Sequence, residues 1–266
     1  LEVYATSDWT TPVLAWDLGA GSEPYDVNYC SGDLFVTLAG HNSLLMVDPD
    51  GGGGQSELSL DAYADSDGNA DPAEVVCQDG LPTVILRRVD STLGKSASGL
   101  VVKFEHGGSW AESQSWTVVG NGHLSSGNED EDVAWVSGGN PGEGDGRVDL
   151  VDLSNEQSWL GVLSEAGVGG LPVYATAYNE GRGLLVVEES TGAAVSCVDL
   201  AGWTTSLLAR PGGTVHPGAI GQEGTAWLPY GAGSDTPGVT AWNADTCTQG
   251  ATWATRLPAT GVALLE

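Results

Sequence analysis

A short apolar segment that ends in an acidic residue or its amide occurs six times along this chain. The copies run from one end to the other: Ala15-Trp16-Asp17, Met46-Val47-Asp48, Lys103-Phe104-Glu105, Leu150-Val151-Asp152, Cys197-Val198-Asp199 and Ala241-Trp242-Asn243. Successive copies lie on average about 45 residues apart, the length of one blade in a repeating all-β ring. The repeat therefore predicts an all-β fold, a six-bladed β-propeller that forms one domain over residues 1–266.

Each repeat can be divided into four strands bounded by clusters of Gly, Asn, Asp and Ser. In the second repeat we expect strands at Asp26–Cys30, Leu34–Leu38, Ser43–Asp48 and Ser56–Leu60. A proline recurs just before the first strand, a position that needs no ladder donor: Pro24, Pro72, Pro172, Pro217 and Pro258.

The spacing at the two ends of the chain predicts how the ring closes. We expect Gly261–Leu264 to be the first strand of a sheet whose next strands are Glu2–Ser7 and Pro12–Asp17. Pairing the C-terminal strand with the N-terminal strands would remove a free sheet edge.

The segments Leu34–Leu38 and Ser43–Asp48 resemble the repeat of YVTN-type secreted bacterial β-propellers. The resemblance covers most of the chain as a repeat pattern and implies a fold. Six-bladed rings of this kind include lactonases, sugar-binding proteins and scaffolds, so the resemblance implies no single activity.

The charge of the chain excludes some partners. The 36 Asp and Glu residues against 8 Lys and Arg residues give a net charge of −28, which repels nucleic acid and anionic lipid surfaces. No apolar run approaches the roughly 20 residues that span a bilayer, so we expect no membrane insertion. The chain opens at Leu1 in a strand-like segment, and we expect this to be the start of a processed product.

The four cysteines predict two disulfides. Cys30 and Cys77 occupy matching places in consecutive repeats, where neighbouring blades can come within bonding reach, and elimination then pairs Cys197 with Cys247. Disulfides are typical of proteins outside the cytosol, so an extracellular or periplasmic location is predicted.

One loop has the spacing of a calcium site. Asp65-Ser66-Asp67-Gly68-Asn69-Ala70-Asp71 places oxygen ligands at alternate positions, as at the start of an EF-hand loop. Ala70 replaces the expected turn glycine and Val76 the expected glutamate, so Asp61 and Glu74 would have to complete the shell. The alternative is an acidic turn that needs no ion.

A second group of residues is expected around the opening of an axial channel. They lie near the starts of the first strands of the repeats: Asp26, Asn28, Glu74, His123, Tyr174 and His216. The three residues Asp26, Asn28 and Glu74 could imitate the metal-binding carboxylates and amides of lactonase-like rings.

Ten tryptophans raise the possibility of sugar stacking. Eight recur at blade spacing and are expected to pack between sheets: Trp16, Trp116, Trp135, Trp159, Trp203, Trp227, Trp242 and Trp253. Trp9 and Trp110 fall in expected turns and are the candidates for contact with a glycan.

Three functions therefore stay open. The first is a secreted binding or scaffold module, stabilised by Ca²⁺ at the 61–74 loop, whose loop-rich face contacts a protein or glycan partner. The second is a metal-dependent, lactonase-like hydrolase that uses the axial channel. The third is a glycan-binding lectin. Long loops at 90–98, 138–147 and 230–238 are expected on the same face as the 61–74 loop.

Overall fold

The computed structural model is nearly all β and divides into two compact units. The first unit holds Leu1–Gly94 and Val101–Ser115, and the second holds Lys95–Leu100 and Trp116–Glu266. Whether they form one domain stays a prediction. The structure describes residues 1–5, 8–50, 54–92, 94–106, 110–126, 132–177, 181–211, 213–216, 218–220, 224–231 and 237–255.

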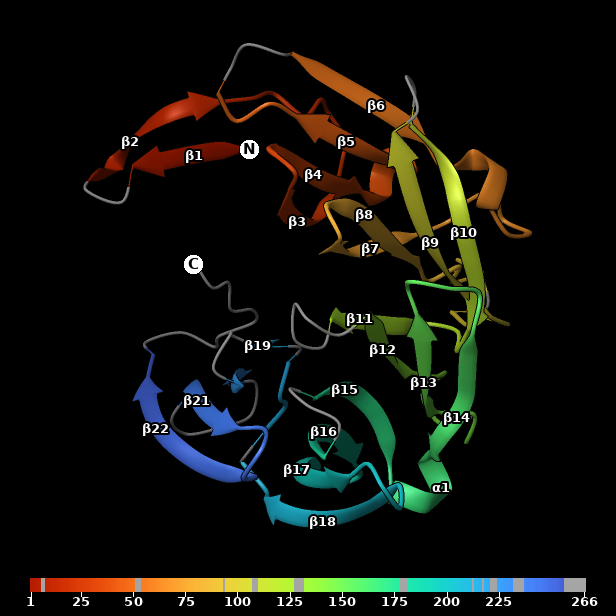
Figure 1. Cartoon of the computed structure of the whole chain (residues 1–266), viewed down its shortest axis with the longest axis vertical. Coiled ribbons are helices and arrows are strands. Elements are labelled where there is room, and N and C mark those ends of the chain that lie inside the picture. The colour runs from red at the N-terminus through yellow and green to blue at the C-terminus, as the bar shows by residue number, and fades with distance from the viewer. Residues whose placement is uncertain are drawn as a thin grey trace. The chain divides into compact units, whose positions relative to one another are not determined.

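Three antiparallel sheets belong wholly or largely to the first unit (Figure 1). The two-stranded sheet pairs β1 (Glu2–Ala5) with β2 (Asp8–Ala15). The first four-stranded sheet is β3 (Pro24–Cys30), β4 (Asp33–Leu38), β5 (Ser43–Val47) and β6 (Gln55–Ser59). The next is β7 (Pro72–Gln78), β8 (Leu81–Leu86), β9 (Gly99–His106) and β10 (Trp110–Val118), of which β9 and β10 include residues of both units.

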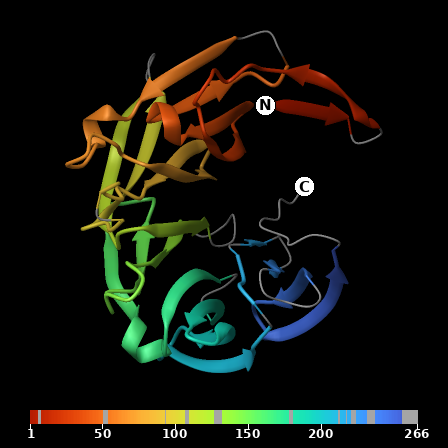
Figure 2. The ribbon, with the colours of Figure 1, turned by 180° about the vertical axis from the view of Figure 1, so that it is seen from behind.

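The second unit has three more four-stranded sheets, each a simple antiparallel meander. The first is β11 (Gly122–Ser126), β12 (Val133–Gly138), β13 (Arg147–Asp152) and β14 (Ser158–Ser164). The second is β15 (Leu171–Ala177), β16 (Arg182–Glu189), β17 (Gly192–Asp199) and β18 (Thr204–Ala209), seen from both sides in Figures 1 and 2. The third is β19 (Ala219–Ile220), β20 (Thr225–Tyr230), β21 (Gly238–Asn243) and β22 (Thr248–Ala254).

Helical structure is limited to short connections. They are the 3₁₀ turns η1 (Ala39–His41) and η2 (Asp61–Tyr63) and the single-turn α1 (Glu165–Val168). None of the helices in the described residues has the length and apolar character needed to cross a membrane.

The predicted strands of the second repeat are confirmed to within two residues at either end. The N-terminal hairpin forms as expected, although β2 begins at Asp8 rather than Pro12. The closing strand Gly261–Leu264 lies outside the described residues, so closure of the ring stays a prediction.

Burial changes across each sheet and explains the sequence pattern. The second and third strands are covered on both faces, so β16 reads as an apolar run in which Leu184 and Leu185 are fully buried. The fourth strands are far more exposed, and every residue of β22 is exposed. In the first unit Val36, Leu38 and Val47 form the centre of a core cluster.

The recurring prolines coincide with irregular pairing. Three of them lie at the start of a first strand, and in each case the register to the second strand shifts directly afterwards: Pro24, Pro72 and Pro172. In β3 and β7 the shift leaves two residues opposite one, which is a β-bulge. Asp26 and Glu74 each occupy the second place of such a bulge.

Both predicted disulfides are confirmed. Cys30 of β3 is bonded to Cys77 of β7, with Cα atoms 5.4 Å apart. Cys197 of β17 is bonded to Cys247, just before β22, with Cα atoms 5.6 Å apart. Each bond links two sheets of one unit. The matching places in the repeat predicted the first bond, and elimination predicted the second. Two disulfides favour an environment outside the reducing cytosol.

Candidate functional site

The acidic loop between β6 and β7 is shaped by its own side chains. Asp65 Oδ1 accepts the backbone N–H of Asp67 at 3.0 Å, and Asp67 Oδ1 accepts that of Asn69 at 3.0 Å. Gly68 has φ +90°, a conformation that costs glycine nothing. The alternating Asp and Asn residues that resemble a metal loop thus form successive Asx turns.

This loop is fastened to the loop that follows β8. Three hydrogen bonds join them: Ser91 N–H to Asp67 Oδ2 (2.7 Å), Val89 N–H to Asp71 Oδ2 (2.7 Å) and Ser66 Oγ–H to Asp90 Oδ2 (3.1 Å). Two long connections of the first unit are therefore held side by side. We call residues 61–71 and 87–92 together the acidic rim.

The carboxylates of the acidic rim influence one another. The Ser91 N–H and other donors hold the pKa of Asp67 well below its ordinary value. Burial raises the pKa of Asp65, and the neighbouring Asp67 charge adds to that rise. Burial also raises the pKa of Asp71, with further contributions from Asp67 and Asp65. The rim therefore concentrates negative charges that repel one another, and Arg88 and Arg87 offset part of that repulsion at Asp65 and Asp71.

The six residues predicted to bind calcium are not brought together in one shell. Asp61 accepts a hydrogen bond from Asn42 Nδ2 at 2.8 Å, while Glu74 lies on β7. Among the residues that the structure describes, no three His, Cys, Asp or Glu side chains gather closely enough to hold a metal ion. The carboxylates of Asp67 and Asp71 accept backbone N–H groups instead. Calcium binding stays a prediction.

Asn42 supports this loop and was not foreseen from the sequence. Its Oδ1 accepts the N–H of Ala70 at 2.8 Å, its Nδ2 donates to Asp61, and its carbonyl accepts the N–H of Leu60 at 2.9 Å. It is 7% exposed and adopts φ +54°. An asparagine between two strands reads simply as a turn residue, so only the structure shows its partners.

Three side chains of the sheet β3–β6 form hydrogen bonds with the backbone of β7. Val75 N–H donates to Asp26 Oδ2 at 2.9 Å, and Asn28 Nδ2 donates to the Val75 carbonyl at 3.1 Å. Thr37 Oγ1 donates to the Ala73 carbonyl at 2.5 Å. We call Asp26, Asn28 and Thr37 the side-chain clasp. It joins two sheets that share no strand ladder, beside the Cys30–Cys77 bond.

Burial raises the pKa of Asp26 to about 6. Hydrogen bonds from the Val75 and Val27 N–H groups oppose the rise, and the Glu74 charge adds to it. The charge of Glu74 thus acts on Asp26, while the place of both residues at a channel opening stays a prediction.

The other predicted channel residues belong to the second unit. His123 is the second residue of β11 and pairs with Ser137 of β12. The backbone N–H of His216 donates to the Pro229 carbonyl at 3.0 Å. Tyr174 is 2% exposed inside a hydrophobic cluster, and burial raises its pKa. Whether these residues share an opening with Asp26, Asn28 and Glu74 stays a prediction.

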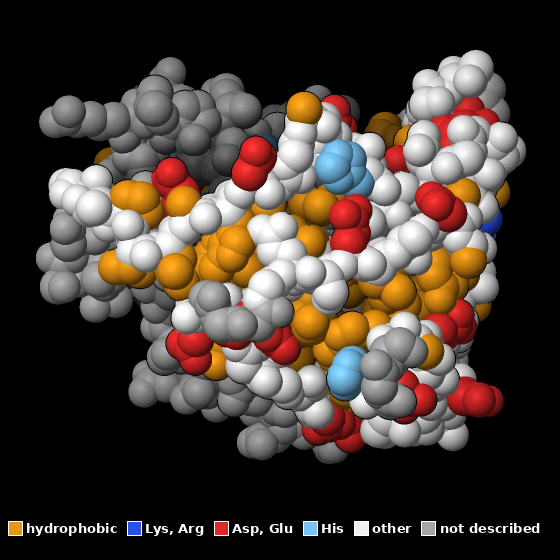
Figure 3. Space-filling view, turned by 90° about the horizontal axis from the view of Figure 1, so that it is seen from above, with side chains coloured by type: hydrophobic (Ala, Val, Ile, Leu, Met, Phe, Trp, Pro, Cys, Tyr) orange, Lys and Arg blue, Asp and Glu red, His pale blue; other side chains and the backbone are white. Residues whose placement is uncertain are grey.

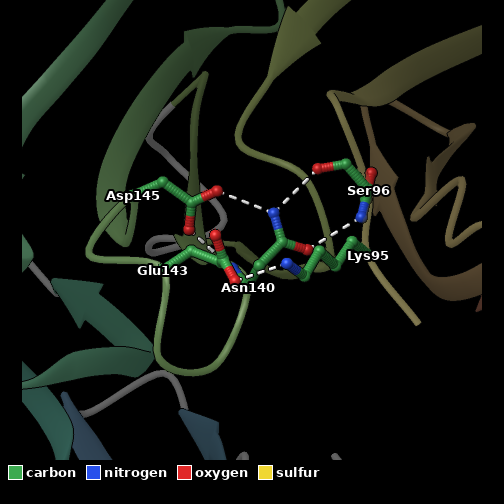
Figure 4. Close-up of polar contacts among 5 residues, drawn as sticks. All are labelled: Lys95, Ser96, Asn140, Glu143 and Asp145. Atoms are coloured by element: carbon green, nitrogen blue, oxygen red, sulfur yellow. Dashed lines mark hydrogen bonds and ion pairs between the residues drawn. The ribbon is translucent and has the colours of Figure 1, made fainter. Parts of the chain in front are cut away.

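The loop between β12 and β13 is organised around Asn140, which the sequence did not single out (Figure 4). Asn140 Oδ1 accepts the Ser96 N–H at 2.7 Å, and its Nδ2 donates to the Ser96 carbonyl at 2.9 Å. The same Nδ2 donates to Asp145 Oδ2 at 2.6 Å. Lys95 forms an ion pair with Glu143 nearby.

Asp149 of β13 is a second residue that sequence reasoning missed. Its side chain is fully buried. Its oxygens accept the N–H groups of Val119 at 2.6 Å and Gly161 at 2.7 Å, and Arg147 Nε donates to it at 2.8 Å. It stands opposite the irregular part of the β13–β14 pairing. An aspartate inside an apolar strand is the only sequence signal that could have revealed it.

The tryptophans that recur with the blade do not share one role. Three of them are less than 5% exposed, as predicted: Trp116, Trp135 and Trp242. Trp159 and Trp253 are instead 43% and 46% exposed on the fourth strands β14 and β22, whereas Trp116 on the fourth strand β10 is buried. The expectation of a fully packed indole is wrong for these two.

The two tryptophans expected in turns lie in strands. Trp9 is part of β2, and Trp110 begins β10. Trp110 stacks edge-on against Phe35 with ring centroids 5.2 Å apart, and its Nε1 donates to Met46 Sδ at 3.1 Å. Trp110 is thus partly committed to packing inside the first unit.

Solved structures resemble this chain in fold. Hydrazine synthase of Kuenenia stuttgartiensis has a TM-score of 0.58 and 13% identity, over 96% of this chain and 70% of that one. The calcium-binding protein regucalcin of Agrobacterium tumefaciens gives 0.53 and 11%, over 92% and 79%. The extracellular domain of a hybrid two-component system protein of B. thetaiotaomicron gives 0.55 and 15%, over 87% of this chain and 30% of that one.

The fold is that of a β-propeller. This chain spans only 30% of the two-component protein chain that it resembles. No protein-family model and no curated protein matches the sequence. Identities this low establish architecture and leave activity to be argued from the residues themselves.

Proposed function

We propose that this chain is a binding module that works outside the cytosol and recognises a basic protein surface through its acidic rim. The observation that carries the proposal is the fastening of the two rim loops by the Asp67–Ser91 and Asp71–Val89 hydrogen bonds. Loops fixed before binding lose less conformational entropy when a partner arrives. The two disulfides support the location.

Charge supports the choice of partner. The chain carries −28, and in the face shown in Figure 3 Asp and Glu side chains are scattered while Lys and Arg hardly appear. An acidic surface accelerates and orients the approach of a basic partner, an effect that salt weakens. The close carboxylates of Asp65, Asp67 and Asp71 make the rim the place where this effect is concentrated.

Binding of a fluorescent Lys/Arg-rich peptide, measured by anisotropy, tests the proposal. The rim variant neutralises Asp65, Asp67 and Asp90 to Asn, which keeps a side-chain oxygen at each position. A matched variant removes equal charge from exposed residues at the other ends of the strands, two in turns and one near the end of β9: Asp50→Asn, Asp79→Asn and Glu105→Gln. We expect the rim variant to weaken binding at least tenfold and the matched variant less than twofold.

An equal loss in both variants would mean that net charge alone attracts the peptide, and the proposal would fail. It would fail equally if the peptide bound no better than a neutral peptide of the same length. Binding on a glycan array without peptide binding would move the partner to the glycan class that the lectin hypothesis describes.

Calcium at the 61–74 loop is a subordinate part of the proposal. Burial raises the pKa of Asp65 and of Asp71, the Asp67 charge adds to both rises, and a bound cation would relieve that repulsion. Calorimetry of chelator-treated protein should show that Ca²⁺ raises the melting temperature of the native chain and not of Asp67→Ala. If Ca²⁺ leaves the melting temperature of both proteins unchanged, the proposal of a calcium site at this loop fails.

The lactonase-like alternative depends on Asp26, Asn28 and Glu74. Two of these side chains are committed to the β7 backbone, which supports a structural role for them. A screen of lactones and esters with added divalent metals separates the readings. Hydrolysis by the native protein that disappears in Asp26→Ala/Glu74→Ala would favour the enzyme.

A further inference from the structure

The second unit contains a cavity of about 300 Å³ between the sheets β15–β18 and β19–β22. This volume is at the lower end of the range of small-molecule sites in proteins, roughly 300 to 1,000 Å³. Its inner wall is apolar and buried, and is made by Val195, Val215, Leu228 and Trp242. Side chains from both sheets thus line one space that is separate from the acidic rim.

The outer part of the cavity carries polar groups. The hydroxyls of Thr240 and Thr252 lie 3.1 Å apart, and Gln249 Nε2 donates to Thr252 Oγ1 at 3.4 Å. Gln249 and Thr252 are exposed residues of β22, whereas Thr240 is buried. A molecule in the cavity would therefore have its apolar body against Trp242 and a polar end beside the hydroxyl pair.

The charges around the cavity favour an uncharged molecule. Arg210 lines it, but its Nε and Nη2 form a bidentate pair with Glu189 at 2.8 and 2.9 Å, which offsets the guanidinium charge. The net charge of −28 repels anions. Among the described residues that line the cavity, none has a carboxylate that would pair with a buried cation.

We propose that this cavity binds a small uncharged ring compound with one hydroxyl-type polar end. The ring packs against Trp242 and Leu228, and the hydroxyl exchanges hydrogen bonds with Thr240 and Thr252. The proposal does not depend on the function of the acidic rim, because the two sites share no residue.

Titration calorimetry with three probes of matched size tests this site: benzyl alcohol, benzoate and benzylammonium. We expect saturable binding of benzyl alcohol, with each charged probe at least tenfold weaker. Thr252→Val, which keeps the side-chain shape, should weaken benzyl alcohol about fivefold and leave toluene unchanged.

Ala209→Leu fills the cavity and should reduce binding of benzyl alcohol at least tenfold. The same change at Ala251, an exposed residue of β22 that does not line the cavity, is the matched control and should have no effect. Circular dichroism and melting establish that each variant is folded; if Ala209→Leu is not, the Thr252→Val comparison decides.

Three results would overturn the proposal. They are the absence of saturable benzyl alcohol binding, binding of benzoate or benzylammonium as tightly as the alcohol, and native-like binding by folded Ala209→Leu. An unchanged affinity of Thr252→Val for benzyl alcohol would likewise contradict the proposed hydrogen bonds between the ligand hydroxyl and the threonine pair.

Discussion

Each unit places a carboxylate beside an irregular stretch of strand pairing, buried at Asp149 and half-buried at Asp26, and the two carboxylates have different partners. Asp149, in the second unit, accepts two backbone N–H groups and the Arg147 guanidinium. Asp26, in the first unit, receives backbone N–H groups without a cation and lies near Glu74, and its pKa rises to about 6. The surroundings of each aspartate therefore decide whether its charge stabilises or destabilises the fold.

The largest expected effect comes from Asp149→Ala. The substitution leaves the buried Val119 N–H, the more exposed Gly161 N–H and the Arg147 guanidinium without their acceptor, so we expect a loss of about 4 kcal/mol in the free energy of unfolding. Chemical denaturation measures it, with Asp199→Ala at the exposed end of β17 as a control that costs less than about 1 kcal/mol. A similar small loss in both variants would contradict the view that Asp149 organises its sheet.

The next effect concerns the disulfide bond within each unit. The bonded cysteines are 47 and 50 residues apart in sequence, so chain entropy predicts nearly equal stabilisation from each bond, with an upper limit of about 4 kcal/mol. Replacing each pair by serine should lower stability by up to that amount. If Cys30→Ser/Cys77→Ser loses much less stability, the side-chain clasp is sufficient to hold β7 against the sheet β3–β6.

A smaller effect is expected from pH. Because the pKa of Asp26 is higher in the folded chain than in the unfolded chain, its contribution to stability is present below pH 4 and is lost as the pH rises to about 6. Asp26→Asn keeps an acceptor for the Val75 N–H and cannot ionise. The difference in stability between variant and native protein should therefore shift by about 2 kcal/mol in favour of the variant between pH 4 and pH 7. A difference that does not change with pH would contradict the assignment.

The smallest effect should come from Lys95→Gln. The Lys95–Glu143 pair is about half exposed on both sides, and such pairs contribute less than about 0.5 kcal/mol. Thermal melting at low and high salt checks this expectation. A loss comparable to that of Asp149→Ala would mean that exposure does not separate strong from weak ion pairs in this chain.

Much of the fold could be predicted because it depends on local pattern. The apolar segments and turn residues of the second repeat located β3 to β6 to within two residues. The disulfides followed from the matching places of Cys30 and Cys77 in consecutive repeats. Both inferences use only the period of the chain and the geometry of neighbouring sheets.

The sites were harder to predict because their partners are distant in sequence. Asn140 binds Ser96, which lies 44 residues earlier, and Asp149 accepts the N–H of Val119. The cavity is lined by strands from β17 to β22, and no short motif marks it. Asp65 and Asp67 show a different difficulty, since their spacing fits a metal loop while their oxygens also accept hydrogen bonds in turns, so that spacing alone does not decide between the two roles.

The side-chain clasp also limits how the repeat could be rearranged. Within a blade, backbone groups make the ladder, so almost any strand-forming sequence can take part. Between β3 and β7 the contacts come from Asp26, Asn28 and Thr37, so they depend on which amino acids are present. A duplicated or transplanted blade would form its own backbone ladder but would lack these side-chain contacts with the next blade. Exchange of blades by recombination should therefore succeed only where the three residues are transferred together with the blade.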